Sequence, residues 1–246
     1  MLKWFSKKKK EEELIPLSFS VLKTDIHSHF IPGIDDGSPD METSVELIKK
    51  MQDLGFKKVI TSPHVMSDFY RNSSETIMKG LNDLRAELKA QNINMEINAA
   101  AEYYIDFEFE QKIGKEKFLT FGDNYILVEL SFLEAPRNLF DIIFKLQLEG
   151  YKVVLAHPER YGYFKQEDYN NLINSGVLLQ INLLSLIGHY STPIQKKTEQ
   201  LIANNQVSFV GTDCHNMIHA QLYEKCQSQK SWHDLVNSGM LLNNTL

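Results

Sequence analysis

Thr24-Asp25-Ile26-His27-Ser28-His29 is a short apolar run that ends in two histidines one residue apart. On a β-strand the side chains at positions i and i+2 point to the same face, so His27 and His29 are spaced to bind one metal ion together. Such a pair is also an ordinary polar feature near strand ends. It therefore predicts a metal site only if other parts of the chain repeat the arrangement.

Short apolar runs recur along the chain, and most are separated by segments with helical periodicity. Gly55, Gly150 and Gly176 stand where predicted helices end and the next strands begin. This alternation favours parallel strands joined by helical crossovers. Besides the run from Thr24, the predicted strands are residues 59–62, 95–101, 125–128, 152–156, 177–181 and 207–210.

The predicted helices carry recognisable start signals. Ser38 is expected to cap the first helix, and Asn72 with Glu75 is spaced as a capping box for the second. Residues 103–122 show no clean period, and we expect an irregular or partly helical segment there that contributes to a substrate rim. The predicted helices are residues 39–54, 72–91, 136–149, 166–174, 193–204, 219–226 and 231–242.

Metal-binding residue types stand at the ends of six of the seven predicted strands. In a β/α barrel such ends meet at one mouth, whereas an open sheet concentrates its site at one crevice. The distribution over so many ends therefore favours a closed barrel of about seven strands, and Asp35 and Asp36 follow closely in the first loop. The strand-end residues are His27 with His29, His64, Glu102, Glu129, His157, and Asp213 with His215.

Each of these residues alone has an ordinary interpretation, such as a loop cap, a rim charge or a helix N-cap. Their joint placement is what predicts a metal centre. Histidine mixed with carboxylate suits Mn, Fe or Zn, and the absence of a thiolate arrangement disfavours a closed structural zinc site. Cys214 alternates with Asp213 and His215, so its side chain is expected to point into packing.

Composition limits the classes of partner. The 246 residues are 43% hydrophobic and carry a formal net charge of −6, which argues against a nucleic-acid-binding surface. Neither cysteine has arginine six positions later, because Ala220 and Trp232 stand there, so a Cys-x5-Arg phosphatase loop is excluded. Two cysteines, no secretory signal and no apolar span of 18 residues lead us to expect a soluble, cytoplasmic protein.

In combination and order, these motifs resemble the PHP (polymerase and histidinol phosphatase) superfamily. Within it, the chain is similar to the manganese-dependent protein-tyrosine phosphatases of bacterial capsule and exopolysaccharide clusters, over about residues 23–220. The resemblance implies a distorted seven-stranded (β/α)7 barrel of the PHP type, which agrees with the strand count. The motifs are His27-Ser28-His29, Ile34-Asp35-Asp36-Gly37, Ser62-Pro63-His64, Ala101-Glu102-Tyr103-Tyr104, His157-Pro158-Glu159-Arg160 and Thr212-Asp213-Cys214-His215.

The resemblance also implies three manganese ions, or Fe or Zn in their place. By motif position, one ion is expected on His27, His29, Glu102 and Asp213, a second on Asp36, His64 and His215, and a third on Glu102, Glu129 and His157. Glu102 would then bridge two ions. A metal-activated hydroxide would attack phosphorus, and Arg160 would neutralise phosphate oxygens.

One departure from the family pattern concerns the segment after Asp213. Relatives often carry an arginine and a proline shortly after the last Asp-x-His, whereas this chain has neither in Asn216-Met217-Ile218-His219-Ala220. His219 either substitutes for a second phosphate-binding cation or only packs, and packing is the preferred interpretation. His189 and His233 are interpreted as surface residues, and Asn182 as a residue behind the site.

The expected function is a phosphotyrosine phosphatase acting on the phosphotyrosine tail of a bacterial tyrosine autokinase that controls polysaccharide synthesis. A small-molecule phosphoesterase, such as a histidinol-phosphate or nucleotide phosphatase, is the alternative, since the same metal centre serves those reactions. A binding module without catalysis is disfavoured because every ligand position holds a competent residue. The candidates for the substrate rim are Tyr103, Tyr104 and Phe107.

The domain prediction is one barrel over residues 21–246, preceded by a disordered tail over residues 1–20. The tail joins Trp4 and Phe5 to the lysines at 7–10 and the glutamates at 11–13. Its charge run is expected to be solvated, with at most a weak contact to an anionic membrane surface. The sequence does not predict an oligomeric state.

Overall fold

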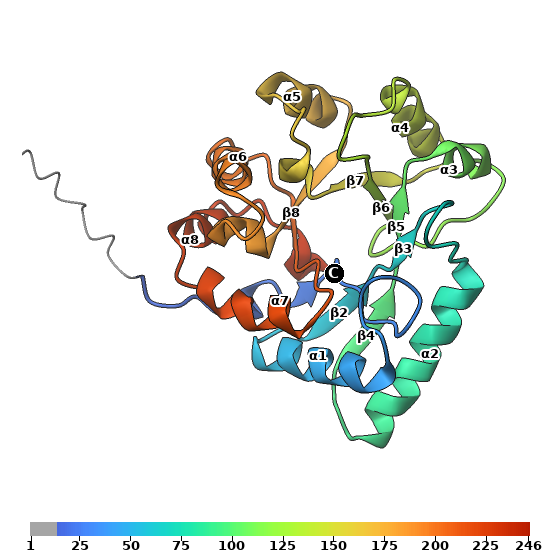
Figure 1. The fold of residues 1–246 in the computed structure, drawn as a ribbon. Coiled ribbons are helices and arrows are strands. Elements are labelled where there is room, and N and C mark those ends of the chain that lie inside the picture. The colour runs from blue at the N-terminus through green and yellow to red at the C-terminus, as the bar shows by residue number, and fades with distance from the viewer. Residues whose placement is uncertain (1–13) are drawn as a thin grey trace, which may run out of the picture.

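The computed structural model describes residues 14–246. Parallel strands lie around a centre and the helices cover them on the outside, as Figure 1 shows. The expected membrane contact of the basic tail falls on residues 1–13, outside the described residues. From residue 14 onward the chain meets the body of the protein, because Leu17 N donates to Gln227 O and Leu17 O accepts from Trp232 Nε1. The predicted tail boundary at residue 20 thus falls within the packed part.

The described strands form two parallel sheets, a three-stranded one in the order β1-β2-β4 and a six-stranded one in the order β3-β5-β6-β7-β8-β9. The pairing is parallel in every ladder, as the alternation of strands and helices predicts. The strands are β1 Thr24–Asp25, β2 Lys58–Thr61, β3 His64–Val65, β4 Glu96–Ala99, β5 Glu102–Tyr104, β6 Tyr125–Glu129, β7 Lys152–Ala156, β8 Leu178–Asn182 and β9 Phe209–Gly211.

Nine strands stand where seven were predicted, because the short strands β3 and β5 follow directly after the predicted runs 59–62 and 95–101. Pro63 has no N–H and separates β2 from β3. Backbone hydrogen bonds before and after Pro63 still join this segment to its neighbouring strands. At the other edge an isolated parallel bridge joins Ser28 to Cys214, so the segment after β1 lies beside the end of β9. The protein therefore has a mixed α/β fold with a curled parallel sheet.

The helices follow the predicted segments with shifted ends. Asp40, not Ser38, caps α1, and Ser73 with Thr76, rather than Asn72 with Glu75, forms the capping box of α2. In both places adjacent polar residues compete for the cap. The helices are α1 Met41–Asp53, α2 Ser74–Ala90, α3 Phe107–Lys112, α4 Leu139–Leu148, α5 Gln166–Asn174, α6 Thr192–Ala203, α7 Met217–Leu222 and α8 Lys230–Asn237, with short 3-10 turns η1 Phe19–Val21, η2 Pro158–Arg160, η3 Leu183–Ile187, η4 Tyr223–Cys226 and η5 Asn243–Thr245.

Alternate residues of the strands build two apolar layers. In β6, Ile126 and Val128 pack toward the helices, while Leu127 belongs to a smaller inner cluster. Phe121 and Phe209 extend that inner cluster, which the C-terminal Leu246 contacts. The centre of the fold is thus filled on one side, and polar side chains occupy the other end of the strands. Within residues 14–246, no helix is both long and apolar enough to cross a bilayer.

Candidate metal centre

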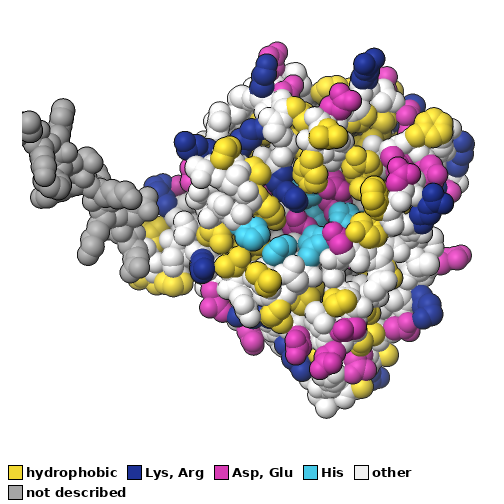
Figure 2. Space-filling model, viewed as in Figure 1, with side chains coloured by type: hydrophobic (Ala, Val, Ile, Leu, Met, Phe, Trp, Pro, Cys, Tyr) yellow, Lys and Arg dark blue, Asp and Glu magenta, His cyan; other side chains and the backbone are white. Residues whose placement is uncertain are grey.

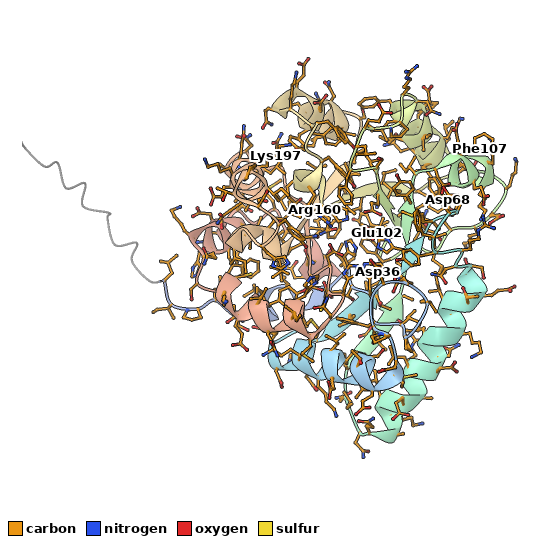
Figure 3. The ribbon with its side chains drawn as sticks, viewed as in Figure 1. Asp36, Asp68, Glu102, Phe107, Arg160 and Lys197 are labelled. Atoms are coloured by element: carbon orange, nitrogen blue, oxygen red, sulfur yellow. The ribbon has the colours of Figure 1, made fainter. Side chains whose placement is uncertain are left out.

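The predicted ligand residues surround one hollow at the ends of the strands. Figure 2 shows histidine and acidic side chains gathered there on one face of the molecule, and Figure 3 shows Asp36, Glu102 and Arg160 converging on it from different elements. The hollow has a volume of about 420 Å³. Its lining residues are Asp36, His64, Glu129, Phe132, His157, Arg160, Tyr190, Asp213, His215, Asn216 and His219.

His27 and His29 lie just beyond β1 and are both fully buried. Their Nε2 atoms are 3.3 Å apart, so both rings present the same nitrogen to the same place. The other nitrogen of each ring is held from behind: His27 Nδ1 is 2.8 Å from Gln180 Oε1, and His29 Nδ1 is 2.8 Å from Asp35 Oδ2. A partner on Nδ1 fixes the tautomer in which Nε2 is free to bind a metal.

Glu102 stands at the centre of the cluster, at the start of β5, with no exposed side-chain surface. Its Oε2 lies 3.1 Å from both His27 Nε2 and His64 Nδ1, and its Oε1 lies 2.9 Å from His157 Nε2. Glu129 approaches from the end of β6, where its Oε1 is 3.7 Å from His157 Nε2. Two carboxylates and three histidines thus meet around one buried position.

Asp213 and Asp36 complete the cluster on the side of α7. Asp213 Oδ1 is 3.5 Å from His27 Nε2 and 3.4 Å from His29 Nε2. Asp36 Oδ1 is 3.5 Å from both His64 Nε2 and His215 Nε2. Asp213 has a φ of +52°, and this sparsely populated backbone conformation turns its carboxylate toward the histidines.

The donor set suits bound cations. Two ligands of one ion, each about 2.1 Å from it and roughly 90–110° apart, lie about 3.0–3.4 Å from each other, which matches these separations. Glu102 Oε2 and His64 Nδ1 are buried and have no hydrogen-bond partner among the described residues. Buried polar atoms without a partner are costly, and a metal ion would satisfy both. His29, Asp36, His64 and His215 also form one group of mutually close donors.

The pKa shifts of the site residues also favour bound cations. Burial and the charges of Glu102 and Asp213 raise the pKa of Glu129 to about 9. Burial alone would also raise the pKa of Glu102, but His27 and His64 hold it well below its usual range. Burial and the positive Arg160 lower the pKa of His157 to about 4, which leaves the ring neutral and able to bind a metal. Without cations, the site therefore cannot hold all its carboxylates ionised.

Replacing Glu129 by glutamine is expected to stabilise the metal-stripped protein at about pH 8. The folded carboxyl keeps its proton up to a pKa of about 9 instead of the ordinary 4.5, so stability falls as pH rises between these values. Glutamine removes this penalty, which we expect to exceed about 1 kcal/mol at pH 8 and to shrink toward pH 5. Urea unfolding in chelator at both pH values measures it, with exposed Glu116→Gln as the control. Equal stability of Glu129→Gln and wild type at pH 8 would contradict this account.

Arg160 ends η2 and reaches into the same hollow (Figure 3). Its Nη1 donates to Asp213 Oδ2 at 3.2 Å, the only side-chain hydrogen bond of Arg160 within the described part of the chain. Its guanidinium carbon lies 4.6 Å from the ring centroid of Phe132 and 4.5 Å from that of Tyr190. Most of its N–H groups are thus available to an anion bound in the hollow.

Several site residues differ from the expectations for the rim. Tyr103 is buried and Phe107 is 75% exposed on α3, away from the hollow, as the label in Figure 3 shows. Phe132 and Tyr190 line the hollow instead. Both stand in loops, where an aromatic residue has no period that would mark it.

Three further residues fill in the surroundings of the ligands. His219 lines the hollow and its Nδ1 is 3.5 Å from His215 N, so it borders the site as well as packing. Asn182 lies behind the site as predicted and donates to Asp213 Oδ2 at 2.6 Å. Gln180 and Asp35 were not singled out as supports of the histidines; their only signal is a polar side chain in a buried strand and beside a predicted ligand.

The sequence matches the model of a known family. The model for capsular polysaccharide synthesis proteins of the CpsB/CapC type covers residues 23–230. This chain belongs to the CpsB/CapC family. Membership confirms the resemblance to phosphatases of capsule clusters, and the matched residues include every candidate metal ligand.

Curated relatives of this CpsB/CapC protein carry a consistent name. The tyrosine-protein phosphatase YwqE of Bacillus subtilis is 31% identical over 196 residues, which cover 78% of this chain and 77% of YwqE. The tyrosine-protein phosphatase CpsB of Streptococcus agalactiae is 24% identical over 201 residues, covering 78% and 83% of the two chains.

Solved structures agree with these matches. One from a study of YwqE of Bacillus subtilis and CpsB of Streptococcus pneumoniae, described as unique metal-dependent tyrosine phosphatases, superimposes with a TM-score of 0.77 at 30% identity. The match covers 90% of this chain and 94% of the other. An amidohydrolase of Mycoplasma synoviae shares the fold at a TM-score of 0.50 and 12% identity, covering 91% and 84% of the two chains.

Proposed function

We propose that this CpsB/CapC protein is a metal-dependent protein-tyrosine phosphatase. The observation that carries the proposal is the convergence of nine ligand-type side chains and one arginine on a single hollow. The names of the relatives give the substrate class, since those proteins are tyrosine-protein phosphatases. The converging side chains are His27, His29, Asp36, His64, Glu102, Glu129, His157, Asp213, His215 and Arg160.

We propose three ions, with manganese as the natural metal and iron or zinc as substitutes. His27, His29, Glu102 and Asp213 would hold the first; Asp36, His64 and His215 the second; and Glu102, Glu129 and His157 the third. Contacts of 2.9–3.7 Å among the donors within these sets support the grouping. Glu102 is the proposed bridge because its two oxygens face different histidines.

The second layer of this centre gives a test of the metal proposal. Gln180→Leu removes the partner of His27 Nδ1 while keeping the size of the side chain. We expect manganese affinity to fall about 10–100-fold, because the histidine loses its fixed orientation. Manganese binding to stripped protein, measured by calorimetry, checks this, with Gln91→Leu at the exposed end of α2 as the control. Unchanged manganese affinity in Gln180→Leu would show that Gln180 does not support the metal centre.

When bound, the ions would supply Lewis acidity for the phosphoryl group and lower the pKa of water from 15.7 to about 7. The chain's own residues bind the phosphate and orient the metal ligands. Arg160 binds phosphate oxygens through N–H groups that lie in the plane of its guanidinium. Gln180 and Asp35 keep the Nε2 atoms of His27 and His29 aimed inward. A phenol, with a pKa near 10, leaves without strong help from a general acid, which favours phosphotyrosine over alkyl phosphates.

The proposed substrate is the phosphotyrosine tail of a bacterial tyrosine autokinase that controls capsular or exopolysaccharide synthesis. The family's link to capsular polysaccharide synthesis supports this partner. The hollow opens on the surface of one face (Figure 2), which suits a side chain presented by a flexible peptide. A kinase phosphorylates its tail where ATP is present. We therefore propose that the phosphatase meets this tail in the cytoplasm.

We propose one domain, a distorted seven-stranded barrel of the PHP type, which also includes residues 14–20 because Leu17 hydrogen-bonds to Gln227 and Trp232. It counts β2 with β3 and β4 with β5 as single strands. The bridge between Ser28 and Cys214 supports closure between the first and last strands.

Phosphate release from three substrates tests the function: a phosphotyrosine peptide, a phosphoserine peptide and histidinol phosphate. Stripped protein, manganese-restored protein and restored His27→Ala are compared. We expect turnover of phosphotyrosine above the other two, dependent on manganese and lost in His27→Ala. Turnover of histidinol phosphate in preference would assign a small-molecule phosphoesterase, and no turnover despite bound metal would assign a binding module.

A further inference from the structure

We propose that Phe132 and Tyr190, called here the aromatic clamp, hold the Arg160 guanidinium where it meets the phosphoryl group. The inference rests on the proposed function in one respect, namely that Arg160 binds the phosphate. Phe132 lies in the loop between β6 and α4, and Tyr190 lies between η3 and α6. The clamp thus joins two loops that are far apart in the sequence but line one hollow.

The geometry is that of cation–π contact on two rings. The guanidinium carbon of Arg160 lies 4.6 Å from the centroid of Phe132 and 4.5 Å from that of Tyr190. A guanidinium stacked on an aromatic face is held through its face, so its in-plane N–H groups stay free. A hydrogen-bonded support would instead occupy the N–H groups that a phosphate needs.

Arg160 needs such support because its polar contacts are few. Among residues 14–246, its side chain makes one hydrogen bond, from Nη1 to Asp213 Oδ2. An arginine side chain has large rotamer freedom, and restricting it before binding lowers the entropic cost of binding an anion. The backbone beyond it is also fixed, since Lys197 Nζ donates to the carbonyls of Tyr161 and Phe164.

The clamp rings are themselves anchored to the metal centre. Asn182 Nδ2 donates to Tyr190 Oη at 3.1 Å and to Asp213 Oδ2 at 2.6 Å, which ties the tyrosine ring to a proposed metal ligand. The Phe132 ring stacks on that of His157, with centroids 5.8 Å apart. The position of the guanidinium is therefore set relative to the proposed ligands.

A double-mutant cycle on the manganese-loaded full chain tests the clamp. Phe132→Leu and Tyr190→Leu remove the rings, Phe132→Tyr and Tyr190→Phe retain them, and Phe144→Leu on the exposed face of α4 is the control. Each is made with Arg160 and with Arg160→Ala. KM and kcat are measured with p-nitrophenyl phosphate, whose good leaving group keeps weak variants measurable, and inorganic phosphate is titrated as a competitive inhibitor.

With Arg160 present, each leucine variant is expected to raise KM and the phosphate inhibition constant about tenfold, with a smaller change in kcat. Phe144→Leu stays within about twofold of wild type. The ring-retaining variants lose less than the leucine variants, and Tyr190→Phe loses more than Phe132→Tyr because it gives up the hydrogen bond from Asn182. In the Arg160→Ala background the leucine substitutions add less than about twofold, because the clamp has nothing left to position.

Two results would overturn the clamp proposal. One is an unchanged KM and phosphate inhibition constant in both leucine variants. The other is an equal rise of these constants with and without Arg160, which would mean that the rings act on the substrate directly. Phe132 is 47% exposed, so its leucine variant decides the matter if Tyr190→Leu does not fold. Preference of the wild type for histidinol phosphate would refute the proposed function alone, and the cycle would then be run on that phosphoester.

Discussion

Glu102→Gln is expected to lower kcat/KM for a phosphotyrosine peptide by about 10³-fold or more. Each factor of ten corresponds to about 1.36 kcal/mol of lost transition-state stabilisation. The carboxylate is fully buried and its oxygens contact His27, His64 and His157 at 2.9–3.1 Å. The amide keeps the shape but loses the charge and one acceptor oxygen, so it cannot bridge two cations. Steady-state kinetics with added manganese, together with bound metal per chain by elemental analysis, measure both consequences.

The matched control for this change is Glu110→Gln on α3. Glu110 pairs with Lys145 on the surface at 2.7 Å, an exposed interaction of small worth. We expect the control to keep full metal content and activity within about twofold of wild type. Full activity and metal content in Glu102→Gln would show that this residue does not bridge the proposed ions.

Arg160→Ala is expected to lower kcat/KM about 10²-fold while leaving metal content unchanged. The guanidinium contributes charge-assisted hydrogen bonds to the phosphoryl group, each worth about 1.5–3 kcal/mol. Arg160→Lys keeps the charge but loses the planar fork, so we expect it to fall between wild type and alanine. Kinetics with the phosphotyrosine peptide, and metal analysis of the same samples, separate loss of phosphate binding from loss of the centre.

The control for Arg160 is Arg137→Ala, an exposed arginine in the loop before α4. It removes the same charge from the surface, and its kcat/KM should stay within about twofold of wild type. An equal loss in both variants would indicate a long-range electrostatic effect rather than phosphate binding by Arg160. Loss of metal in Arg160→Ala would mean that its contact with Asp213 supports the centre.

The order of strands and helices could be predicted because apolar runs and helical periods are local properties. β7 and α5 coincide with their predicted ranges, and β6 differs only by including Glu129. Helix caps were wrong where two candidates stand close together, as Ser38 and Asp40 do. The division of β2 from β3 depends on the position of Pro63 between neighbouring strands. That position is a tertiary property, and the local sequence around Pro63 does not predict it.

The candidate site shows the same division between local and tertiary information. Histidines and carboxylates that follow apolar runs stand out in the sequence. The fold brings six of the predicted ligands to the lining of one hollow and buries the other three, His27, His29 and Glu102, directly behind it. Gln180 and Phe132 do not stand out, because a buried glutamine and a loop phenylalanine gain their roles only from residues brought beside them. Asn72 likewise ties the loop at Ile34 to His64 by two hydrogen bonds instead of capping α2.

A manganese titration of the metal-stripped full chain, with bound ions per chain and phosphotyrosine turnover measured on the same samples, tests the central claim most directly. We expect no turnover in stripped protein and a rise in turnover that follows loading up to three ions per chain. Full turnover in stripped protein, or none with three ions bound, would contradict it.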